Sequence, residues 1–350
     1  MNALLTQPLI IAFLIATITT PLVISFFKKR NWLDDPRKHQ HPKVIHKKAV
    51  PRGGGISVFL AIALTALLLL PLDKHLISIL LAGLLATAVG VRDDIKEISP
   101  YVRLAANLLV ALIIILGGIG VDYITNPFDT VFHLNQIYLG PLPIIKIGFT
   151  LFWLVWCMNI VGWSGGIDGQ LPGFVSISAI IIGLLSLRFS QDIAQWPVIT
   201  LSGSIAGAYL GLLIFNAYPQ KITPGYSGKS LAGLMLGTLA ILSGAKVNTA
   251  ILVLALPMID GGFIIIRRLI KRKSPVWGDA QHLHHLLLKI GIPKPKVALL
   301  YWIFSLILGL VVLNLNSKQK FYFLGMAIFA IGVSILTLEK IINKKRGEII

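Results

Sequence analysis

Eleven long apolar runs follow one another along the chain, and they constrain its fold more than any other feature. A bilayer core about 30 Å thick needs roughly 20 apolar residues per helix, and backbone groups in lipid must be hydrogen-bonded within the segment. The runs therefore predict membrane-spanning helices and not a β-barrel, whose strands would alternate between apolar and polar residues. The predicted spans are residues 4–27, 54–72, 77–91, 102–121, 147–163, 171–187, 197–216, 229–243, 247–266, 297–315 and 321–341.

The composition excludes an ordinary soluble enzyme. Of the 350 residues, 13% are charged, about half of the roughly 25% found in soluble proteins. The lone Cys157 excludes an internal disulfide framework and a Cys-rich metal site. With no convincing repeat or low-complexity segment, we predict one all-α polytopic membrane domain over residues 1–350. It would have 10–11 transmembrane helices and a cytoplasmic active-site cleft.

The chain has a net charge of +18, and the distribution of its basic residues predicts an orientation in the membrane. Nucleic acid is one reading of such a basic chain, but the apolar runs separate the basic residues, so no nucleic-acid partner is expected. Cytoplasmic loops of membrane proteins are enriched in Lys and Arg. With the N-terminus outside, 26 of the 32 Lys and Arg residues fall on inner segments. We therefore predict an inner (plasma) membrane protein with its N-terminus outside and its C-terminus in the cytoplasm.

The first inner segment ends in the sequence PRGGG, residues 51–55. Glycines at a helix start allow a ligand to approach the backbone closely and leave N–H groups free for an anion. Alternatively, the segment is a basic loop that contacts acidic lipid headgroups.

Two adjacent carboxylates, Asp93 and Asp94, end the third span. Such a pair is costly near a membrane unless a cation offsets it. Mg²⁺ prefers oxygen ligands and keeps substrate phosphates in its shell, so the pair suits a Mg²⁺-diphosphate site. Alternatively, the carboxylates belong to the start of a solvated loop and pair with Arg92, Lys96 or Arg103.

Two further inner turns carry polar residues. Asn159 closes the fifth span, and Asp168 follows it in a glycine-rich turn. Gly and Asp are also usual residues of a plain tight turn. Asn216 precedes residues 224–230, PGYSGKS, which resemble a phosphate loop only partly, because Thr223 replaces the required Gly and no strand precedes it. A weaker anion site beside Lys229, at the start of the eighth helix, remains plausible.

Three imidazoles, His282, His284 and His285, fall within four residues of the last large inner loop. Histidines bind metals, but no Glu or Cys completes a zinc pattern here. They can also donate hydrogen bonds to phosphate, or serve a purely structural role. Span interiors hold almost no charge, with Asp260 as the exception.

The order and shared side of these segments resemble the polyprenyl-phosphate N-acetylhexosamine-1-phosphate transferase family. This family includes the undecaprenyl-phosphate GlcNAc-1-phosphate transferases and the phospho-N-acetylmuramoyl-pentapeptide transferases. The histidine cluster is closer to the GlcNAc branch. The positions that carry the resemblance are residues 51–55, Gly90, Asp93, Asp94, residues 159–169, Asn216, Pro219, Asp279 and residues 282–285.

The resemblance implies an enzyme, a phosphotransferase that moves a sugar-1-phosphate from a UDP-sugar to a polyprenyl phosphate and releases UMP. This would be the first membrane step of peptidoglycan or surface-polysaccharide synthesis, in a monomer or a homodimer. It implies catalytic roles for Asp93, Asp94 and Asp168, with Mg²⁺, or alternatively Mn²⁺, held by the first two. The substrate-binding residues that it implies, together with those expected from the motifs, are Arg52, Asn159, Asn216, Lys229, His282, His284 and His285.

This chain departs from the family pattern at three positions. The family usually shows Asn-x-x-Asn-x-x-Asp-Gly-x-Asp-Gly, in which Gly162 and Gly165 here replace the second Asn and the first Asp. Where the family has a metal-binding Asp at the start of the eighth helix, this chain has Tyr226. A neutral phenol is a poor Mg²⁺ ligand. Cationic side chains such as Lys229 would then take over part of the metal's role. Two alternatives are a scaffold that binds lipid phosphate or nucleotide without turnover, and a transporter, which would need more charge within the spans.

Overall fold

The computed structural model describes residues 3–35, 49–125, 130–243, 251–272, 274 and 281–347. Three sequence features discussed above fall outside these ranges. They are Asp279, most of the first inner segment (residues 36–48) and the beginning of the span predicted for residues 247–266.

Within the described residues, a helix occupies at least part of each predicted span. Seven helices are long and apolar enough to cross a membrane, and α2 and α4 are shorter apolar helices. The chain is therefore an all-α, multi-pass membrane protein, as predicted. The helices are α1 (Ala3–Lys29), α2 (Gly54–Leu69), α3 (Lys74–Ile95), α4 (Pro100–Leu116), α5 (Ile144–Trp163), α6 (Gln170–Leu187), α7 (Trp196–Asn216), α8 (Gly225–Leu242), α10 (Ala255–Ile270), α11 (Leu283–Lys289), α12 (Lys294–Leu313) and α13 (Ser317–Gly347).

Short antiparallel strand pairs and one 3₁₀ turn connect some of these helices. β1 (Leu33–Asp34) pairs with β2 (Val50–Pro51) and brings the two ends of the first inner segment together. The other pairs are β3 (Tyr123–Thr125) with β4 (Val131–His133) and β5 (Tyr138–Leu139) with β6 (Leu142–Pro143), and the 3₁₀ turn η1 spans Ile193–Gln195.

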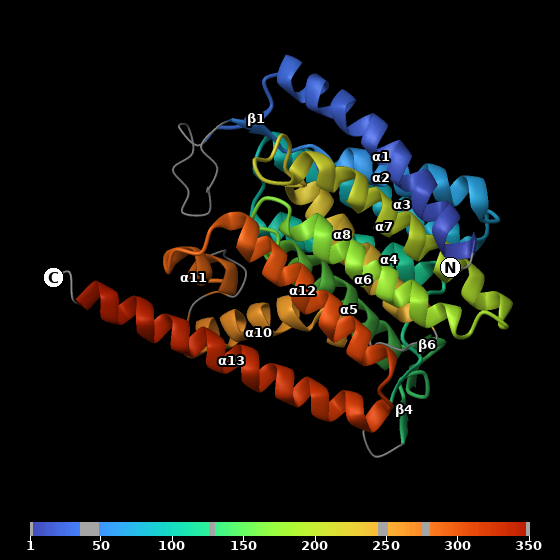
Figure 1. Cartoon of the computed structure of the whole chain (residues 1–350). Coiled ribbons are helices and arrows are strands. Elements are labelled where there is room, and N and C mark those ends of the chain that lie inside the picture. Colours follow the sequence, from blue (N-terminus) through green and yellow to red (C-terminus); the bar gives the residue numbers. More distant parts are fainter. Residues whose placement is uncertain are drawn as a thin grey trace.

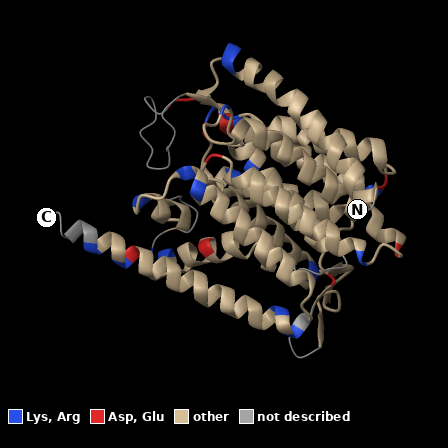
Figure 2. Ribbon diagram, viewed as in Figure 1, with Lys and Arg blue, Asp and Glu red and all other residues tan. Residues whose placement is uncertain are grey.

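The helices run side by side, and the first and last of them end on opposite sides of the bundle (Figure 1). α1 begins at one end of the bundle, whereas the C-terminal end of α13 lies at the other end, on the side of α11. Lys, Arg, Asp and Glu gather at the ends of the helices, and the stretches between are largely free of them (Figure 2). This division of charge is what a chain embedded in a bilayer requires.

Helix α8 lies in the centre, where it contacts α2, α3, α4, α5, α6 and α7. Its sequence, GYSGKSLAGLMLGTLAIL, is rich in small residues, which let helix backbones approach closely in membranes. A Cβ at Gly233 would overlap the backbone of Cys157 and Met158 in α5. The small residues therefore explain why a comparatively polar helix can fill the middle of the bundle.

Three glycines four residues apart, Gly203, Gly207 and Gly211, form a second close contact, between α7 and α1. A Cβ at each position would overlap the α1 backbone, at the carbonyl oxygens of Leu5, Leu9 and Phe13 respectively. The opposite face of α1 is lined by Ile10, Leu14, Ile18 and Leu22, which are exposed apolar side chains suited to lipid. This glycine stripe holds α1 against the rest of the bundle.

We expect Gly207→Val to destabilise the protein by about 1–3 kcal/mol, because the added side chain must push α1 away from α7. The measurement is the thermal unfolding midpoint in detergent. Gly325→Val in α13 is the matched control, because a Cβ there meets nothing within 4 Å. Equal midpoints for the two variants would show that the α1–α7 contact does not limit stability.

Candidate functional site

The carboxylate of Asp94 binds the N-terminus of α8, although it lies at the C-terminal end of α3. Its Oδ1 accepts a hydrogen bond from the backbone N–H of Tyr226 at 2.6 Å. Its Oδ2 accepts from the N–H of Ser227 at 3.2 Å and from the Ser227 hydroxyl at 2.6 Å. The first N–H groups of a helix lack partners within the helix, and its N-terminus favours negative charge. The buried Asp94 therefore fixes α8 against α3.

Arg52 neutralises this carboxylate from the turn after β2. Its Nε lies 3.6 Å from Asp94 Oδ1, and its Nη1 lies 3.4 Å from Glu97 Oε1. Burial lowers the pKa of Arg52, but the charges of Asp94, Asp34 and neighbouring carboxylates outweigh it, so the pKa is raised. Arg52 therefore remains a cation at this end of the bundle, and its part in binding a substrate stays a prediction.

Asp93 makes a different set of contacts from its neighbour. Its Oδ1 accepts from Arg103 Nε at 2.7 Å and from the N–H of Ile98 at 3.0 Å. Among the described residues, its buried Oδ2 has no hydrogen-bond partner. The guanidinium of Arg103 also covers the ring of Tyr226, 5.1 Å from its centroid. The two adjacent carboxylates are thus split between α4 and α8.

Tyr226 lies beside both carboxylates. Its backbone binds Asp94, and its ring meets the Arg103 that binds Asp93. Its hydroxyl donates to Asn107 Oδ1 at 3.2 Å, and the hydroxyl of Ser230 donates to the same oxygen at 3.3 Å. The phenol is therefore part of a polar network, at the position where the family pattern has an Asp.

The three glycines of residues 53–55 serve helix packing, which corrects the prediction that they leave N–H groups free for an anion. The N–H of Gly54 donates to the carbonyl oxygen of Thr223, and that of Gly55 to Pro224, each at 3.1 Å. A Cβ at Gly55 would overlap the backbone of Ser227. The sequence could not reveal this, because a glycine suits a neighbouring helix as well as a ligand.

Lys229 lies over two of the positions that depart from the family pattern. A Cβ at Gly165 would sit 3.1 Å from Lys229 Cε, and one at Gly162 would sit 3.5 Å from Lys229 Cβ. Larger side chains at these glycines would therefore contact the lysine stem. The charge of Lys229 also acts on His284, so the lysine links the α5–α6 turn to the histidine cluster.

The three histidines form one stack at the start of α11. The rings of His282 and His284 are parallel, with centroids 5.5 Å apart, and the rings of His284 and His285 are 4.2 Å apart. His284 packs on Gly166, where a Cβ would overlap its ring. Within the described part of the chain, neither of its buried ring nitrogens has a hydrogen-bond partner. Two buried nitrogens without a partner, under the influence of the charge of Lys229, suit an anionic or polar ligand.

Burial lowers the pKa of His284 well below its ordinary value of 6.5, and the neighbouring His285, His282 and Lys229 lower it further. The neutral ring is therefore favoured in the folded state. Its contribution to stability is complete above pH 6.5 and is lost as the pH falls below that value. We expect the thermal midpoint to drop between about pH 8 and about pH 5, and to drop less in His284→Gln. An equal drop in both proteins would contradict this.

Asp168 and Asn216 meet at the turn before α6. Asp168 lies near two partners, the N–H of Gln220 at 3.4 Å and Lys294 Nζ at 3.7 Å. Asn216 accepts from the N–H of Gly169, which has a positive φ of 76°, and donates to the carbonyl oxygen of Ile222 at 2.8 Å. The Asn216 amide therefore holds two turns together, and its contact with a substrate stays a prediction.

Asn159 lies to one side of these residues, in an apolar groove between α4, α5 and α10. Its Nδ2 donates to the carbonyl oxygen of Val155 at 2.8 Å. The groove has a volume of about 240 Å³ and is lined by Leu104, Leu108, Leu151, Phe152, Val155, Trp156, Asn159, Ile160, Trp163 and Ile265. Trp163 connects it to the histidines, because its ring centroid lies 6.1 Å from that of His282.

These contacts join five inner segments that lie far apart in the sequence, at one end of the bundle. We call the set the polar cluster; it comprises Arg52, Asp93, Asp94, Asp168, Lys229, His282, His284 and His285. Sequence reasoning named Arg103 as a partner of the carboxylates, and the structure confirms its ion pair with Asp93, but it missed three other supporting residues, Asn107, Ser227 and Lys294. Their charge or polarity was visible, but nothing local to the sequence indicates which distant carboxylate or phenol each one contacts.

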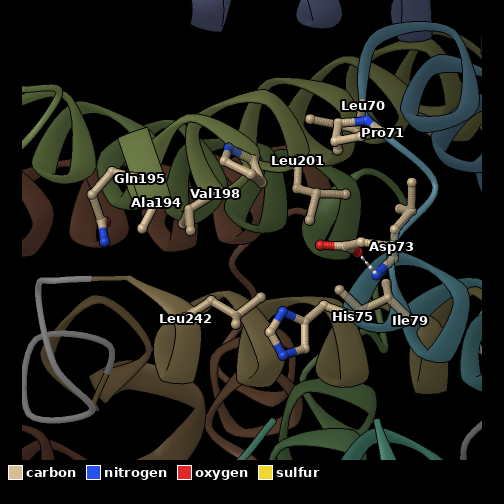
Figure 3. Close-up of a pocket in the computed structure, with 12 residues that line it drawn as sticks. Leu70, Pro71, Asp73, His75, Ile79, Ala194, Gln195, Val198, Leu201 and Leu242 are labelled. Atoms are coloured by element: carbon tan, nitrogen blue, oxygen red, sulfur yellow. Dashed lines mark hydrogen bonds between the residues drawn. The ribbon is translucent and has the colours of Figure 1, made fainter. Parts of the chain in front are cut away.

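A second cavity lies at the opposite end of α3 and α8 (Figure 3). It has a volume of about 230 Å³, is mainly apolar, and includes Asp73, His75, Val198 and Leu242. The Asp73 carboxylate accepts a hydrogen bond from the N–H of Leu76 at 2.7 Å. The 22 residues of α3 separate this cavity from the polar cluster, a distance of about 30 Å along the helix. It is therefore not part of the same site.

Comparison with known proteins connects the polar cluster to a family. The model of glycosyl transferase family 4 matches residues 76–244, which include Asp93, Asp94, Asp168 and Lys229. A protein of Bacillus subtilis (strain 168), named "Probable undecaprenyl-phosphate N-acetylglucosaminyl 1-phosphate transferase", is 24% identical over 95% of this chain and 90% of its own length.

Two further relatives carry related names. The undecaprenyl-phosphate alpha-N-acetylglucosaminyl 1-phosphate transferase of Thermotoga maritima is 29% identical over 89% of this chain and 90% of its own length. The phospho-N-acetylmuramoyl-pentapeptide-transferase of Desulforapulum autotrophicum is 29% identical over 87% of this chain and 90% of its own length. The family match includes four of the eight residues of the polar cluster, and the relatives match nearly end to end, so the chain is similar to glycosyl transferase family 4.

Proposed function

We propose that the chain is a membrane phosphotransferase that moves an N-acetylhexosamine-1-phosphate from a UDP-sugar to undecaprenyl or another polyprenyl phosphate. The observation that carries the proposal is the placing of a cationic and imidazole-rich cluster beside an apolar groove, at one end of membrane helices. The named activities of the relatives support it. The transfer would be the first membrane step of cell-wall or surface-polysaccharide synthesis.

The proposed reaction brings two anions together. An oxygen of the polyprenyl phosphate attacks the phosphorus that bears the sugar, and the bond from that phosphorus to UMP breaks. The main needs are positioning and neutralisation of charge, because the attacking phosphate and the diphosphate repel each other. Lys229 and the histidines would hold the diphosphate, and Arg52 would add positive charge beside Asp94. Asp168, fixed near Lys294, would face the nucleotide or sugar.

The apolar groove is proposed to hold the lipid chain. It opens among α4, α5 and α10 and is lined almost entirely by Leu, Ile, Val and aromatic side chains. Trp163 lines the groove and also faces His282, so a lipid in the groove would have its head near the histidines. Asn159, the one polar side chain of the lining, would lie beside it.

Mg²⁺, or alternatively Mn²⁺, is proposed as the cofactor, held by Asp93. The orphaned Oδ2 of Asp93 is a buried carboxylate oxygen that suits a hard cation. Asp94 fits less well as the second ligand, because both its oxygens accept hydrogen bonds from α8. Among the described residues no group of three His, Cys, Asp or Glu side chains could hold a metal. Bound there, a cation would neutralise part of the negative charge of the phosphates, and Lys229 would neutralise the rest.

Tyr226→Asp tests this cofactor site. A carboxylate beside Asp93 is expected to lower the Mg²⁺ concentration needed for half-maximal UMP release by about tenfold, which corresponds to roughly 1.4 kcal/mol. Tyr226→Asn is the matched control, because it removes the phenol without adding charge. The same metal response in both variants would place the cation elsewhere.

The protein is proposed to lie in the inner (plasma) membrane, as a monomer or homodimer, with its N-terminus outside and the polar cluster in the cytoplasm. The distribution of Lys and Arg supports this orientation. The opposite positions of the two ends of the chain agree with it (Figure 1).

The experiment is a panel of UDP-sugars offered to purified protein in liposomes, with undecaprenyl phosphate and Mg²⁺ or Mn²⁺. We expect UMP release and a labelled lipid-diphosphate-sugar with at least one UDP-N-acetylhexosamine, and no release without the lipid phosphate. Thermal stabilisation by these ligands without any product would instead support the scaffold alternative.

A further inference from the structure

We propose that Asp260, a buried carboxylate of α10, is a positioning residue that fixes the ring of His282 for its contact with the substrate. This inference rests on the proposed function, because it assigns a task to the histidine cluster. Asp260 stands out in the sequence as a charge within a predicted span, and nothing in the family resemblance gave it a role.

The Asp260 carboxylate binds two neighbouring residues, through the ring of His282 and the backbone N–H of Leu283. Its Oδ2 lies 2.8 Å from His282 Nδ1, and its Oδ1 accepts a hydrogen bond from the N–H of Leu283, also at 2.8 Å. An ionised carboxylate only accepts hydrogen bonds, so we assign a proton to His282 Nδ1. The second ring nitrogen, Nε2, is then turned away from Asp260, where it can meet a ligand.

The same contacts orient the rest of the histidine cluster. Leu283 is the first residue of α11, so the Asp260 carboxylate also fixes where that helix begins. The ring of His282 is stacked on His284 with an interplanar angle of 6°, and it also neighbours His285 and Trp163 of the apolar groove. A change in the His282 ring would therefore alter the surface that His284 and Trp163 present together.

The position of Asp260 argues against a merely structural role. The side chain is 2% exposed, and α10 is otherwise apolar around it, with Leu256, Pro257 and Ile264 also buried. A buried charge is costly unless it is paired, and apolar side chains of similar size often stabilise a core as well. If Asp260 served only to pack the core, an apolar side chain would stabilise the protein as well. An apolar side chain could not fix which nitrogen of His282 is protonated.

A double-mutant cycle tests the inference through activity. We expect Asp260→Asn to lower kcat/KM for the UDP-sugar by about 10–100-fold, the range typical of residues that orient a binding histidine. In a His282→Ala background, the same substitution should lower it less than about threefold, because the ring to be oriented is absent. His282→Asn should be as impaired as His282→Ala, since its amide can replace Nδ1 but not Nε2.

The cycle can also overturn the inference. An equal effect of Asp260→Asn in both backgrounds would show that Asp260 acts independently of His282. Wild-type activity in His282→Asn would show that only the bond to Asp260 matters, and not the ring. Asp122→Asn is the matched control, because its carboxylate pairs with Lys146 at 2.6 Å, away from the histidines. It should leave kcat/KM unchanged.

A measurement without substrate separates this inference from the proposed function. The ¹⁵N NMR spectrum of histidine-labelled protein in nanodiscs, assigned with His282→Asn, reports which ring nitrogen is protonated. We expect a protonated Nδ1 for His282 in the wild type and in Asp122→Asn, and a shift to Nε2–H in Asp260→Asn, whose amide can donate to Nδ1. An unprotonated Nδ1 in the wild type would overturn the inference, even if the protein is an active transferase.

Discussion

Replacing Lys229 with methionine is expected to lower the rate of UMP release by about 100–1,000-fold, the loss typical when one preorganised group that stabilises developing charge is removed. Lys229 lies over Gly162 and Gly165, and its charge acts on His284, so its ammonium belongs to the polar cluster. Methionine keeps most of the apolar stem that packs on the glycines. The measurement is kcat with the best UDP-sugar of the panel.

Two further variants sharpen this prediction. Lys229→Arg should retain part of the activity, because it keeps the charge but changes its shape. Lys221→Met, which removes an exposed lysine in the loop before α8, should have close to wild-type activity. We propose that Lys229 takes over part of the role of the metal that the missing carboxylates would bind. Full activity of Lys229→Met would contradict this.

Replacing Asp94 with alanine is expected to destabilise the protein by about 3–5 kcal/mol, the cost of breaking a buried ion pair by removing one partner. The substitution leaves the N–H groups of Tyr226 and Ser227 without their acceptor and leaves Arg52 without its buried carboxylate partner. Because α8 is the central helix, its N-terminus should loosen. The measurement is the thermal unfolding midpoint in detergent.

Ser227→Ala is the matched control for Asp94→Ala. It removes the hydroxyl that donates to Asp94 but keeps the charge and both backbone hydrogen bonds. We therefore expect a smaller loss, of about 1–3 kcal/mol. An unchanged midpoint in Asp94→Ala, together with lost activity, would contradict the role of Asp94 in fixing α8 and would favour direct contact with a metal or substrate.

The helices could be predicted from the sequence because lipid permits few alternatives for a long apolar segment. Each predicted span contains a helix within the described residues, and α8 begins at Gly225, four residues before its predicted start. That difference matters, since residues 225–228 form the turn that Asp94 binds. The small residues of this turn lower its hydropathy, so the predicted span began after it. The same small residues let the turn pack in the centre of the bundle.

The partners of the polar residues could not be predicted in the same way. Asp93 and Asp94 are adjacent in sequence, yet one binds Arg103 of α4 and the other binds α8. The direction of each side chain depends on helix packing that no local pattern encodes. The glycines of residues 53–55 illustrate the same limit, because close approach of a ligand and of a second helix both require glycine.

The convergence of the inner turns into one diphosphate-binding site is tested most directly by a structure of the protein with a UDP-sugar bound. We expect the diphosphate within hydrogen-bonding distance of Lys229 Nζ and of a nitrogen of His282, His284 or His285, with the sugar or nucleotide near Asp168. A UDP-sugar bound elsewhere, for example in the cavity of Figure 3, with no contact to Lys229 or the histidines, would contradict the account.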